Sequence, residues 1–207
     1  MPITIEQGRE LVSEFCRIYP AAYQLKYKVR ATQEEIFGKG ATIEKKGVLF
    51  GAYFPAERMV ALVASNAPDI QHFTETIRHE VLGHFGLNTL RASEKKAIVD
   101  VISKTRGQPS LSKVWSNIDV HYPKHLELFK AEEIFCIACE SIKPNQTISS
   151  LRARHVFHQV VLARSRSMDR HDLSAIAIMV ADGLKNRTRF QQTFPATDND
   201  QWSREGN

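Results

Sequence analysis

The order of apolar patterns along this chain constrains its fold more than any other sequence feature. Two short runs rich in β-formers, GVLFGAYF at residues 47–54 and RMVALVAS at residues 58–65, flank Pro55-Ala56-Glu57. Such a pair predicts a β-hairpin, and residues 42–44 suggest a strand before it. After residue 68 the apolar residues recur at helical spacing. A small antiparallel sheet beside many helices predicts an α+β fold dominated by helix.

Apolar spacing and start signals place the helices. Apolar residues recur at helical spacing over residues 4–18, and Thr4 with Gln7 three positions later predicts a capping box. A second helical piece is expected at residues 22–37. Later helices are expected at residues 69–86, 92–105, 110–117, 123–142, 147–166 and 169–186. No linker separates two cores, so we expect one domain over residues 1–190 and a polar, flexible tail over residues 191–207.

Composition narrows the class of protein. The chain has 207 residues, of which 43% are hydrophobic and 25% charged, as in ordinary soluble domains. No apolar run approaches the roughly 20 residues that span a bilayer, and no signal peptide is visible. An odd set of three cysteines, Cys16, Cys136 and Cys139, favours a reducing compartment. We therefore expect a cytoplasmic protein without a membrane partner, whose oligomeric state the sequence leaves open.

Positive charge gathers in the C-terminal third. Residues 151–190 contain eight Lys or Arg and three Asp, which equals the whole formal net charge of +5. A basic segment of this kind predicts contact with nucleic acid, and the alternative is a set of solvated arginines on ordinary helices. The side chains expected to make the DNA contact are Arg152, Arg154, Arg164 and Arg166.

The stretch RHEVLGHFGL, residues 78–87, holds two histidines and a glutamate on the helix expected at residues 69–86. In the common pattern His-Glu-x-x-His, residues four apart differ by about 40° around a helix, so both rings point the same way. Here His79 and His84 are five apart, which gives about 140° on a regular helix. A π-bulge would restore a shared face, and Gly83 tolerates unusual backbone angles. We therefore expect a widened helix around residues 81–83.

HEVLGH, residues 79–84, closely resembles the His-Glu-Leu-Leu-Gly-His motif of the dipeptidyl peptidase III family. More broadly it resembles the gluzincin branch of the zincin metallopeptidases and zincin-like domains in large plasmid and phage proteins. The resemblance covers the motif regions rather than the whole chain. It implies a third ligand from a glutamate on a later helix, and Glu132-Glu133 resembles the stretch that supplies it. Glu133 is the better match and Glu132 the reserve.

The resemblance implies a zinc-dependent peptidase with a small sheet packed on the metal-site helix. Zn²⁺ would be held by His79, His84 and Glu133, with water at the fourth position. Glu80 would act as the general base that accepts a proton from this water, and a peptide or protein would be the substrate. The alternative is a nucleic-acid-associated protein of a mobile element, in which the zincin fold is a weakly active or inactive scaffold.

Two further groups have weaker signals. His155 and His158 lie three apart on one expected helix and could stabilise a transition state, although one buried and one solvated histidine is the simpler interpretation. Cys136 and Cys139 form a C-x-x-C spacing among apolar residues, which favours small core side chains over a redox or metal pair. His121 and Tyr122 precede the Glu132-Glu133 helix and could face the cleft.

Overall fold

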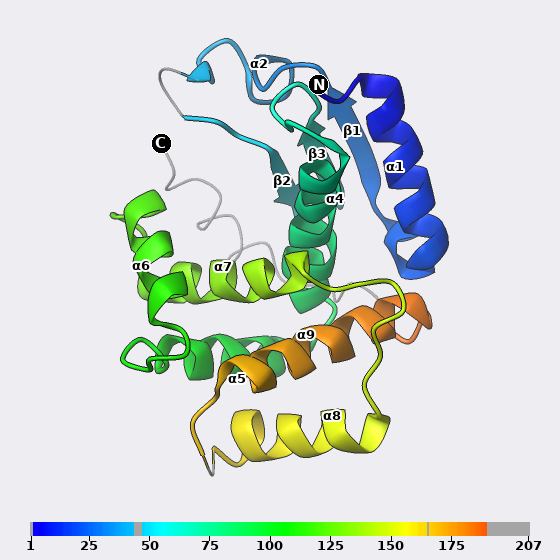
Figure 1. The fold of residues 1–207 in the computed structure, drawn as a ribbon. Coiled ribbons are helices and arrows are strands. Elements are labelled where there is room, and N and C mark those ends of the chain that lie inside the picture. Colours follow the sequence, from blue (N-terminus) through cyan, green and yellow to red (C-terminus); the bar gives the residue numbers. More distant parts are fainter. Residues whose placement is uncertain (1, 44–46, 165, 190–207) are drawn as a thin grey trace.

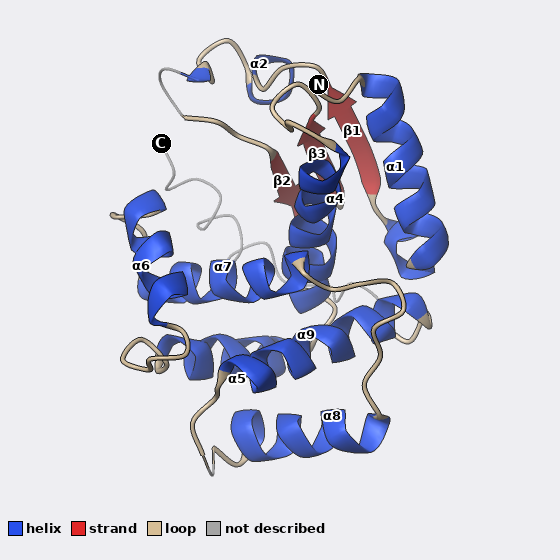
Figure 2. Cartoon of the chain, viewed as in Figure 1, coloured by secondary structure: helices blue, strands red, loops and turns tan. Residues whose placement is uncertain are grey.

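A small sheet and a set of helices meet at the helix that contains the motif (Figures 1 and 2). The computed structural model describes residues 2–43, 47–164 and 166–189. The N-terminal elements are α1 (Ile5–Ile18), the 3₁₀ turn η1 (Pro20–Gln24), β1 (Lys26–Arg30), α2 (Glu34–Phe37), β2 (Gly51–Phe54) and β3 (Met59–Val63). The rest is helical, so the α+β class expected from the sequence is confirmed.

The hairpin expected from the sequence is present. β2 pairs antiparallel with β3, with Phe54 opposite Met59. β3 is the central strand in the order β1-β3-β2, and its residues Val60 to Val63 are fully buried. This explains its nearly continuous apolar sequence. The free edge of β2 lies beside the motif helix, so the hairpin forms one wall of the site.

Residues 22–37 differ from the single helix expected there. They form the end of η1, the strand β1 and the short helix α2, and β1 pairs in parallel with β3, with Val29 opposite Leu62. The sheet is therefore mixed rather than purely antiparallel. β1 is an edge strand with charged residues at alternate positions, and of its five residues only Val29 is buried. The strand is held by its partner β3, which the local sequence does not reveal.

The strand expected at residues 42–44 is absent at Thr42 and Ile43, and Glu44 lies outside the described residues. The loop before β2 is held instead by the buried amide of Gln33. Its Nε2 donates to the carbonyls of Ala41 and Gly47, and its Oε1 accepts from the backbone N–H of Leu49. This positions the entry to β2.

The C-terminal elements are α4 (Ile70–Arg78), the π-helical segment η2 (His79–Phe85), α5 (Ala92–Ser103), α6 (Ser112–His121), α7 (Glu127–Glu140), α8 (Ser150–Val156), the π-helical segment η3 (Phe157–Leu162) and α9 (Arg170–Lys185). In Figure 1, α7 crosses below the sheet, with α5 and α9 beneath it and α8 farthest from the sheet.

Local signals explain where two of these helices begin. Thr4 and Gln7 form the expected capping box at α1, with Thr4 Oγ1 accepting from the Gln7 N–H at 3.1 Å. Asp69 caps α4 by accepting from the His72 N–H at 2.8 Å. Among the described residues, no helix is long and apolar enough to cross a membrane. The tail expected at residues 191–207 lies outside the described residues.

Candidate metal centre

The widened helix expected around Gly83 is present. α4 continues without a break into η2, whose π-helical turns cover the whole motif from His79 to Phe85. The extra residue per turn brings the two imidazole rings to one face, with ring centroids 5.2 Å apart. This confirms the local prediction: His79 and His84 share a face because the helix is π, although their spacing is five.

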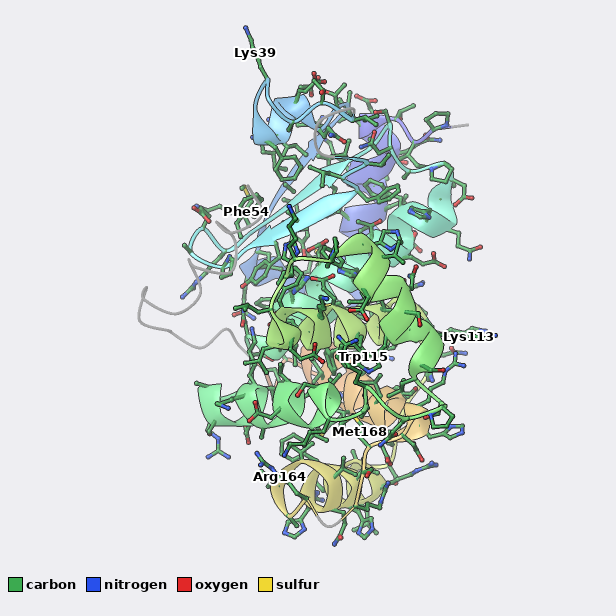
Figure 3. The ribbon with its side chains drawn as sticks, turned by 90° about the vertical axis from the view of Figure 1, so that its left-hand side faces the viewer. Lys39, Phe54, Lys113, Trp115, Arg164 and Met168 are labelled. Carbon is green, nitrogen blue, oxygen red and sulfur yellow. The ribbon has the colours of Figure 1, made fainter. Side chains whose placement is uncertain are left out.

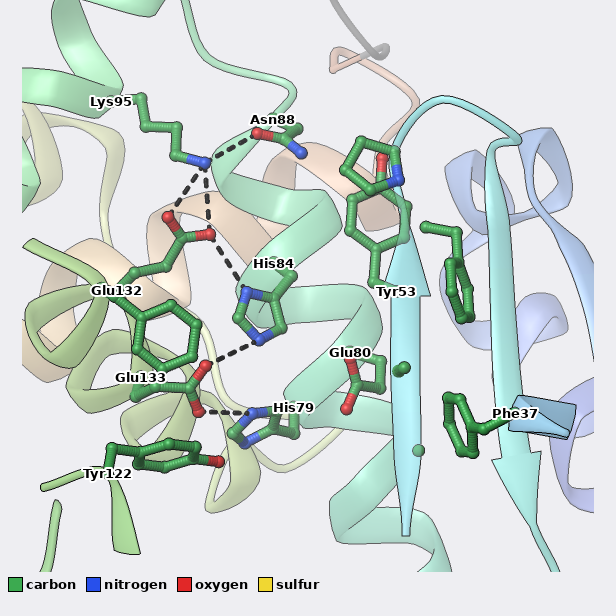
Figure 4. Close-up of a pocket in the computed structure, with 15 residues that line it drawn as sticks. Phe37, Tyr53, His79, Glu80, His84, Asn88, Lys95, Tyr122, Glu132 and Glu133 are labelled. Carbon is green, nitrogen blue, oxygen red and sulfur yellow. Dashed lines mark hydrogen bonds and ion pairs between the residues drawn. The ribbon is translucent and has the colours of Figure 1, made fainter. Parts of the chain in front are cut away.

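Glu133 of α7 lies between the two rings (Figure 4). Its Oε2 is 3.3 Å from His79 Nε2, and its Oε1 is 3.3 Å from His84 Nε2. Donors about 2.0–2.1 Å from a zinc ion at the centre of a tetrahedron are separated by roughly 3.3–3.4 Å along each edge. Glu133 thus contacts each ring through a different oxygen, at a separation typical of two donors around one ion.

The outer nitrogens of both rings are held by two other carboxylates of α7. His79 Nδ1 lies 2.8 Å from Glu140 Oε1, and His84 Nδ1 lies 3.0 Å from Glu132 Oε1. Lys95 of α5 donates to Glu132 at 3.0 Å and to Asn88 Oδ1 at 2.9 Å. A carboxylate on Nδ1 leaves Nε2 free to accept a metal and fixes the ring orientation, as is usual around histidine ligands.

The charges of the centre favour a bound cation. Burial is the largest influence on the pKa of Glu133 and would raise it, but His84 and His79 hold it well below its usual range. For Glu132, burial also raises the pKa, and Lys95 and His84 together lower it to about 2. Burial would lower the pKa of His79, yet Cys136, Glu133 and the other surrounding acids raise it well above its ordinary value. Acidic groups thus outweigh desolvation around both rings, and a metal ion would meet the same field.

Gly83 lets α7 approach η2 closely. A Cβ placed on Gly83 would lie 2.6 Å from Cys136 Sγ and 2.8 Å from Cys136 Cα. The backbone angles of Gly83 are not in the left-handed region, unlike those of Gly38 and Gly47. Gly83 therefore does not use the left-handed region that favours glycine, although it lies within the π-helical segment η2. Its missing side chain provides the space, and this contact sets the depth at which Glu133 meets the histidines.

Cys136 is fully buried behind the rings, and its Sγ lies within 4.8 Å of a nitrogen of His79 and of His84. The described residues thus contain a His-His-Cys group that could hold a metal ion. Glu133 is not in this group, although each of its oxygens lies 3.3 Å from one ring nitrogen, so Cys136 and Glu133 are both candidates for the third ligand. The expectation that Cys136 is a core side chain accounts for its burial but not for its neighbours.

The centre opens into two pockets of about 330 Å³ and about 400 Å³, which share Gly51, His79, Glu80, Tyr122 and Glu133. The edge of β2 forms the facing wall (Figure 4). Glu80 is buried beside both histidines, and burial raises the pKa of its carboxyl. Tyr122 turns its hydroxyl toward His79, and burial raises the pKa of this group also.

The structure brings together the predicted His79, Glu80, His84, Glu132 and Glu133, with Glu132 against the outer side of His84 rather than facing both rings. It does not bring His155 and His158 to this centre. Both are exposed, on α8 and η3 at the end of the molecule away from the sheet (Figure 1).

Glu140 and Lys95 were not recognised from the sequence. Glu140 follows Glu133 by seven positions, and this spacing returns to the same helix face, so a search at that spacing along α7 would have found it. Lys95 leaves no comparable signal, because only the packing of α5 beside α7 brings it to Glu132.

The donor set suits zinc better than magnesium. Two imidazoles and one carboxylate, with a thiol nearby, are donors that zinc and related transition metals take. Mg²⁺ prefers an octahedral set of oxygens and retained waters. The residues present therefore fit a transition-metal ion of the zinc type.

Removing either outer carboxylate is expected to weaken metal binding without abolishing it. Glu132→Gln and Glu140→Gln should each lower zinc affinity by about 10–100-fold, because each ring loses the partner that orients it. Competition with a chromophoric chelator measures the affinity. Glu14→Gln is the control, since Glu14 is exposed on α1 and lines neither pocket of the centre. Wild-type affinity in both variants would show that the rings are oriented without these carboxylates.

No protein-family model and no solved structure matches this chain. It is 35% identical over 208 residues to a protein of Escherichia coli named DNA primase TraC, an alignment that covers 94% of this chain. The chain spans only 14% of the length of that relative. The similarity is thus to one segment of a much longer enzyme.

This similarity corrects the expected function. A chain that matches a DNA primase over nearly its whole length is not placed among hydrolases, proteases or metalloproteases, so the prediction of a zinc-dependent peptidase is wrong. The general-base role expected for Glu80 and the expected peptide substrate were parts of that prediction, and neither is retained. The error has a physical reason: the motif predicts a group of metal-binding side chains, and such a group does not specify the reaction performed beside it. The alternative, a nucleic-acid-associated protein of a mobile element, fits the comparison better.

Proposed function

We propose that this chain is a metal-binding domain that acts on plasmid DNA and contacts nucleic acid through its C-terminal basic surface. The observation that supports this most is the similarity to a DNA primase over 94% of the chain. Because the chain corresponds to 14% of that relative, we do not carry primer synthesis over to it, and propose only a part in DNA processing.

The zinc-type donors also support a role other than nucleotide transfer. Transfer of nucleotides relies on Mg²⁺ held by carboxylates and phosphates. His79, His84 and Glu133 offer a different donor set, so we propose that zinc stabilises the junction of η2 and α7. In this proposal the fold is zincin-like, and its centre serves as a scaffold.

The basic surface consists of Arg152, Arg154, Arg164 and Arg166, all exposed on α8 and on the connection from η3 to α9. It lies at the end of the molecule opposite the sheet (Figure 1). Arg152 and Arg154 make no ion pair within the part of the chain that the structure describes. A surface that neutralises four phosphates loses affinity on the order of 100-fold between 50 and 200 mM salt.

Neutralising this surface tests the proposal. The variant Arg152→Gln/Arg154→Gln/Arg164→Gln should bind a fluorescent oligonucleotide much more weakly, with a plot of log K against log salt less steep by roughly two to three. Arg166 is kept, because its guanidinium pairs with the buried Asp172 at 2.5 and 2.6 Å. Removing it would leave a buried charge unpaired. Fluorescence anisotropy with single-stranded and duplex DNA gives the constants.

The matched control removes the same charge elsewhere. Arg9, Arg17 and Lys26 are exposed on α1 and β1, distant from α8 (Figure 1). Arg9→Gln/Arg17→Gln/Lys26→Gln should keep the wild-type salt slope. Equal losses in both triple variants would mean that net charge, and not this surface, attracts the DNA. Absence of DNA binding by the wild type at low salt would disprove the proposed function.

A further inference from the structure

A third pocket, remote from the metal centre, lies where the end of α5 meets the connection between η3 and α9. Its volume is about 260 Å³. Three cationic side chains line it, Lys104, Arg164 and Arg166, and of the described residues that line it none is acidic. Its floor includes Met168, which is fully buried. Figure 3 shows Arg164 between α5 and α8, with Met168 deeper in the molecule.

The three cations differ in how they are held. Arg166 is fixed by a bidentate ion pair with Asp172. The carboxylate of Asp172 also accepts from the backbone N–H of Asp169 and so caps α9. Lys104 has no carboxylate partner in the part of the chain that the structure describes. Arg164 is 3.7 Å from Asp100, and this carboxylate is already held by Lys96 at 2.7 Å. The pocket therefore combines one preorganised guanidinium with two cations that are available to a ligand.

The backbone at the rim is unusual. Arg164 has φ of 51°, in the left-handed region that a residue with a side chain seldom adopts. It comes two residues after the π-helical segment η3, a second local irregularity. Such features cluster at binding sites, where the surrounding structure maintains them. Here they turn the end of η3 toward Lys104, so that a side chain from each segment borders the same pocket.

Neutral donors complete the lining. Ser167 and Gln108 border the pocket, and no hydrogen bond of either side chain is present among the described residues. Hydroxyl and amide groups beside cations are the donors that recognise phosphate oxygens. A small anion with three or four oxygens matches the pocket better than an apolar ligand. An apolar ligand would leave the charged groups of the pocket unpaired.

We propose that this pocket binds one phosphate group, and that in the functioning protein this phosphate belongs to the backbone of bound nucleic acid. The inference rests on the proposed function for the source of the phosphate but not for the pocket itself. Lys104 and Arg164 supply the mobile charges, and Arg166 supplies a fixed one. The four arginines of the basic surface thus have two roles in this proposal. Arg164 and Arg166 belong to a phosphate site, and Arg152 and Arg154 attract nucleic acid from an open surface.

Lys104→Gln is the direct test, because Lys104 is exposed and its side chain forms no hydrogen bond or ion pair with the described residues. Its affinity for a short oligonucleotide at low salt should fall on the order of tenfold, and the salt slope should drop by about 0.7–0.9, the value for one phosphate. Lys113→Gln is the matched control, since Lys113 is exposed on the neighbouring α6 and does not line the pocket (Figure 3). Lys113→Gln should change neither quantity.

Titration with inorganic phosphate and with a nucleoside triphosphate, followed by backbone NMR, separates the sources. Shifts of Gln108 and Ser167 in wild type, lost in Lys104→Gln, support the pocket. If DNA binds and Lys104→Gln behaves like Lys113→Gln, the pocket proposal is overturned while the proposed function stands. If DNA does not bind and phosphate or nucleotide still shifts these residues, the proposed function fails and the pocket stands as a free-phosphate site. No shifts and no DNA binding would overturn both.

Discussion

Replacing His79 or His84 by alanine is expected to abolish stoichiometric zinc binding. Each ring supplies one of the Nε2 atoms that lie 3.3 Å from a Glu133 oxygen, and one imidazole with one carboxylate holds zinc far more weakly than the complete set. Wild-type protein should gain about 2.7 kcal/mol of unfolding free energy when free zinc is at 100 times its dissociation constant. Elemental analysis and chemical unfolding with and without zinc measure both effects.

The control for this prediction is His158→Ala, because His158 is exposed on η3 and the structure does not bring it to the centre. It should bind zinc like the wild type. Equal zinc content in all three variants would mean that His79 and His84 do not bind the ion.

The identity of the third ligand can be decided with two further variants. Glu133→Gln keeps the size of the side chain but removes its charge, and should greatly weaken metal binding. Cys136→Ser should weaken it little if Glu133 is the ligand. Cobalt substitution adds a spectroscopic criterion, since a thiolate ligand produces an intense charge-transfer band that carboxylate and imidazole ligands lack. Such a band, lost in Cys136→Ser, would assign Cys136 to the coordination shell.

Gly83→Ala is expected to destabilise the protein by about 2 kcal/mol and to displace the metal ligands. Alanine favours a helix interior over glycine by about 1 kcal/mol, so helix propensity alone predicts a more stable variant. Overpacking costs about 1–3 kcal/mol, and the upper end applies because the new methyl group would meet the backbone Cα of Cys136 at 2.8 Å. The steric cost should win and lower the melting temperature by roughly 4–8 °C.

The comparison variant for Gly83 is Gly107→Ala. A Cβ on Gly107 would have no heavy atom within 4 Å, and Gly107 is not among the glycines with positive φ. Thermal unfolding of both variants, together with zinc affinity, gives the measurement. A Gly83→Ala protein as stable as the wild type, with full zinc affinity, would show that α7 and η2 are not in the close contact described.

The two π-helical segments show how far sequence reasoning reaches. The widening of η2 can be predicted, because two histidines at a spacing of five need a widened helix in order to share one ion. For η3 the sequence FHQVVL contains no such pair, and an ordinary helix was expected there. A distortion can thus be predicted where a chemical requirement depends on it, and otherwise it results from packing.

The strand β1 shows the opposite limit. Its sequence KYKVR fits a helix as well as a strand, and the hydrogen bonds that decide between them come from β3, roughly thirty residues later. The hairpin of β2 and β3 needed no such partner, because both strands and their turn are local. Pairing between strands that are distant in sequence cannot be predicted from a short stretch of the chain.

By itself, the sequence determined the α+β class, the hairpin and most helix positions, because periodicity is a local property. The spacing of His79 and His84 predicted a shared face on a widened helix, and Glu80 and Glu133 were predicted through the resemblance to the zincins. The tertiary structure decided how these residues meet. Only the packing of α7 against Gly83 places Glu133 between the rings, Glu132 and Glu140 behind them, and Lys95 on Glu132. It also gathers Lys104 with Arg164 and Arg166, which lie 60 or more positions farther along the chain. Such encounters depend on how helices distant in sequence pack together, and no local pattern encodes them.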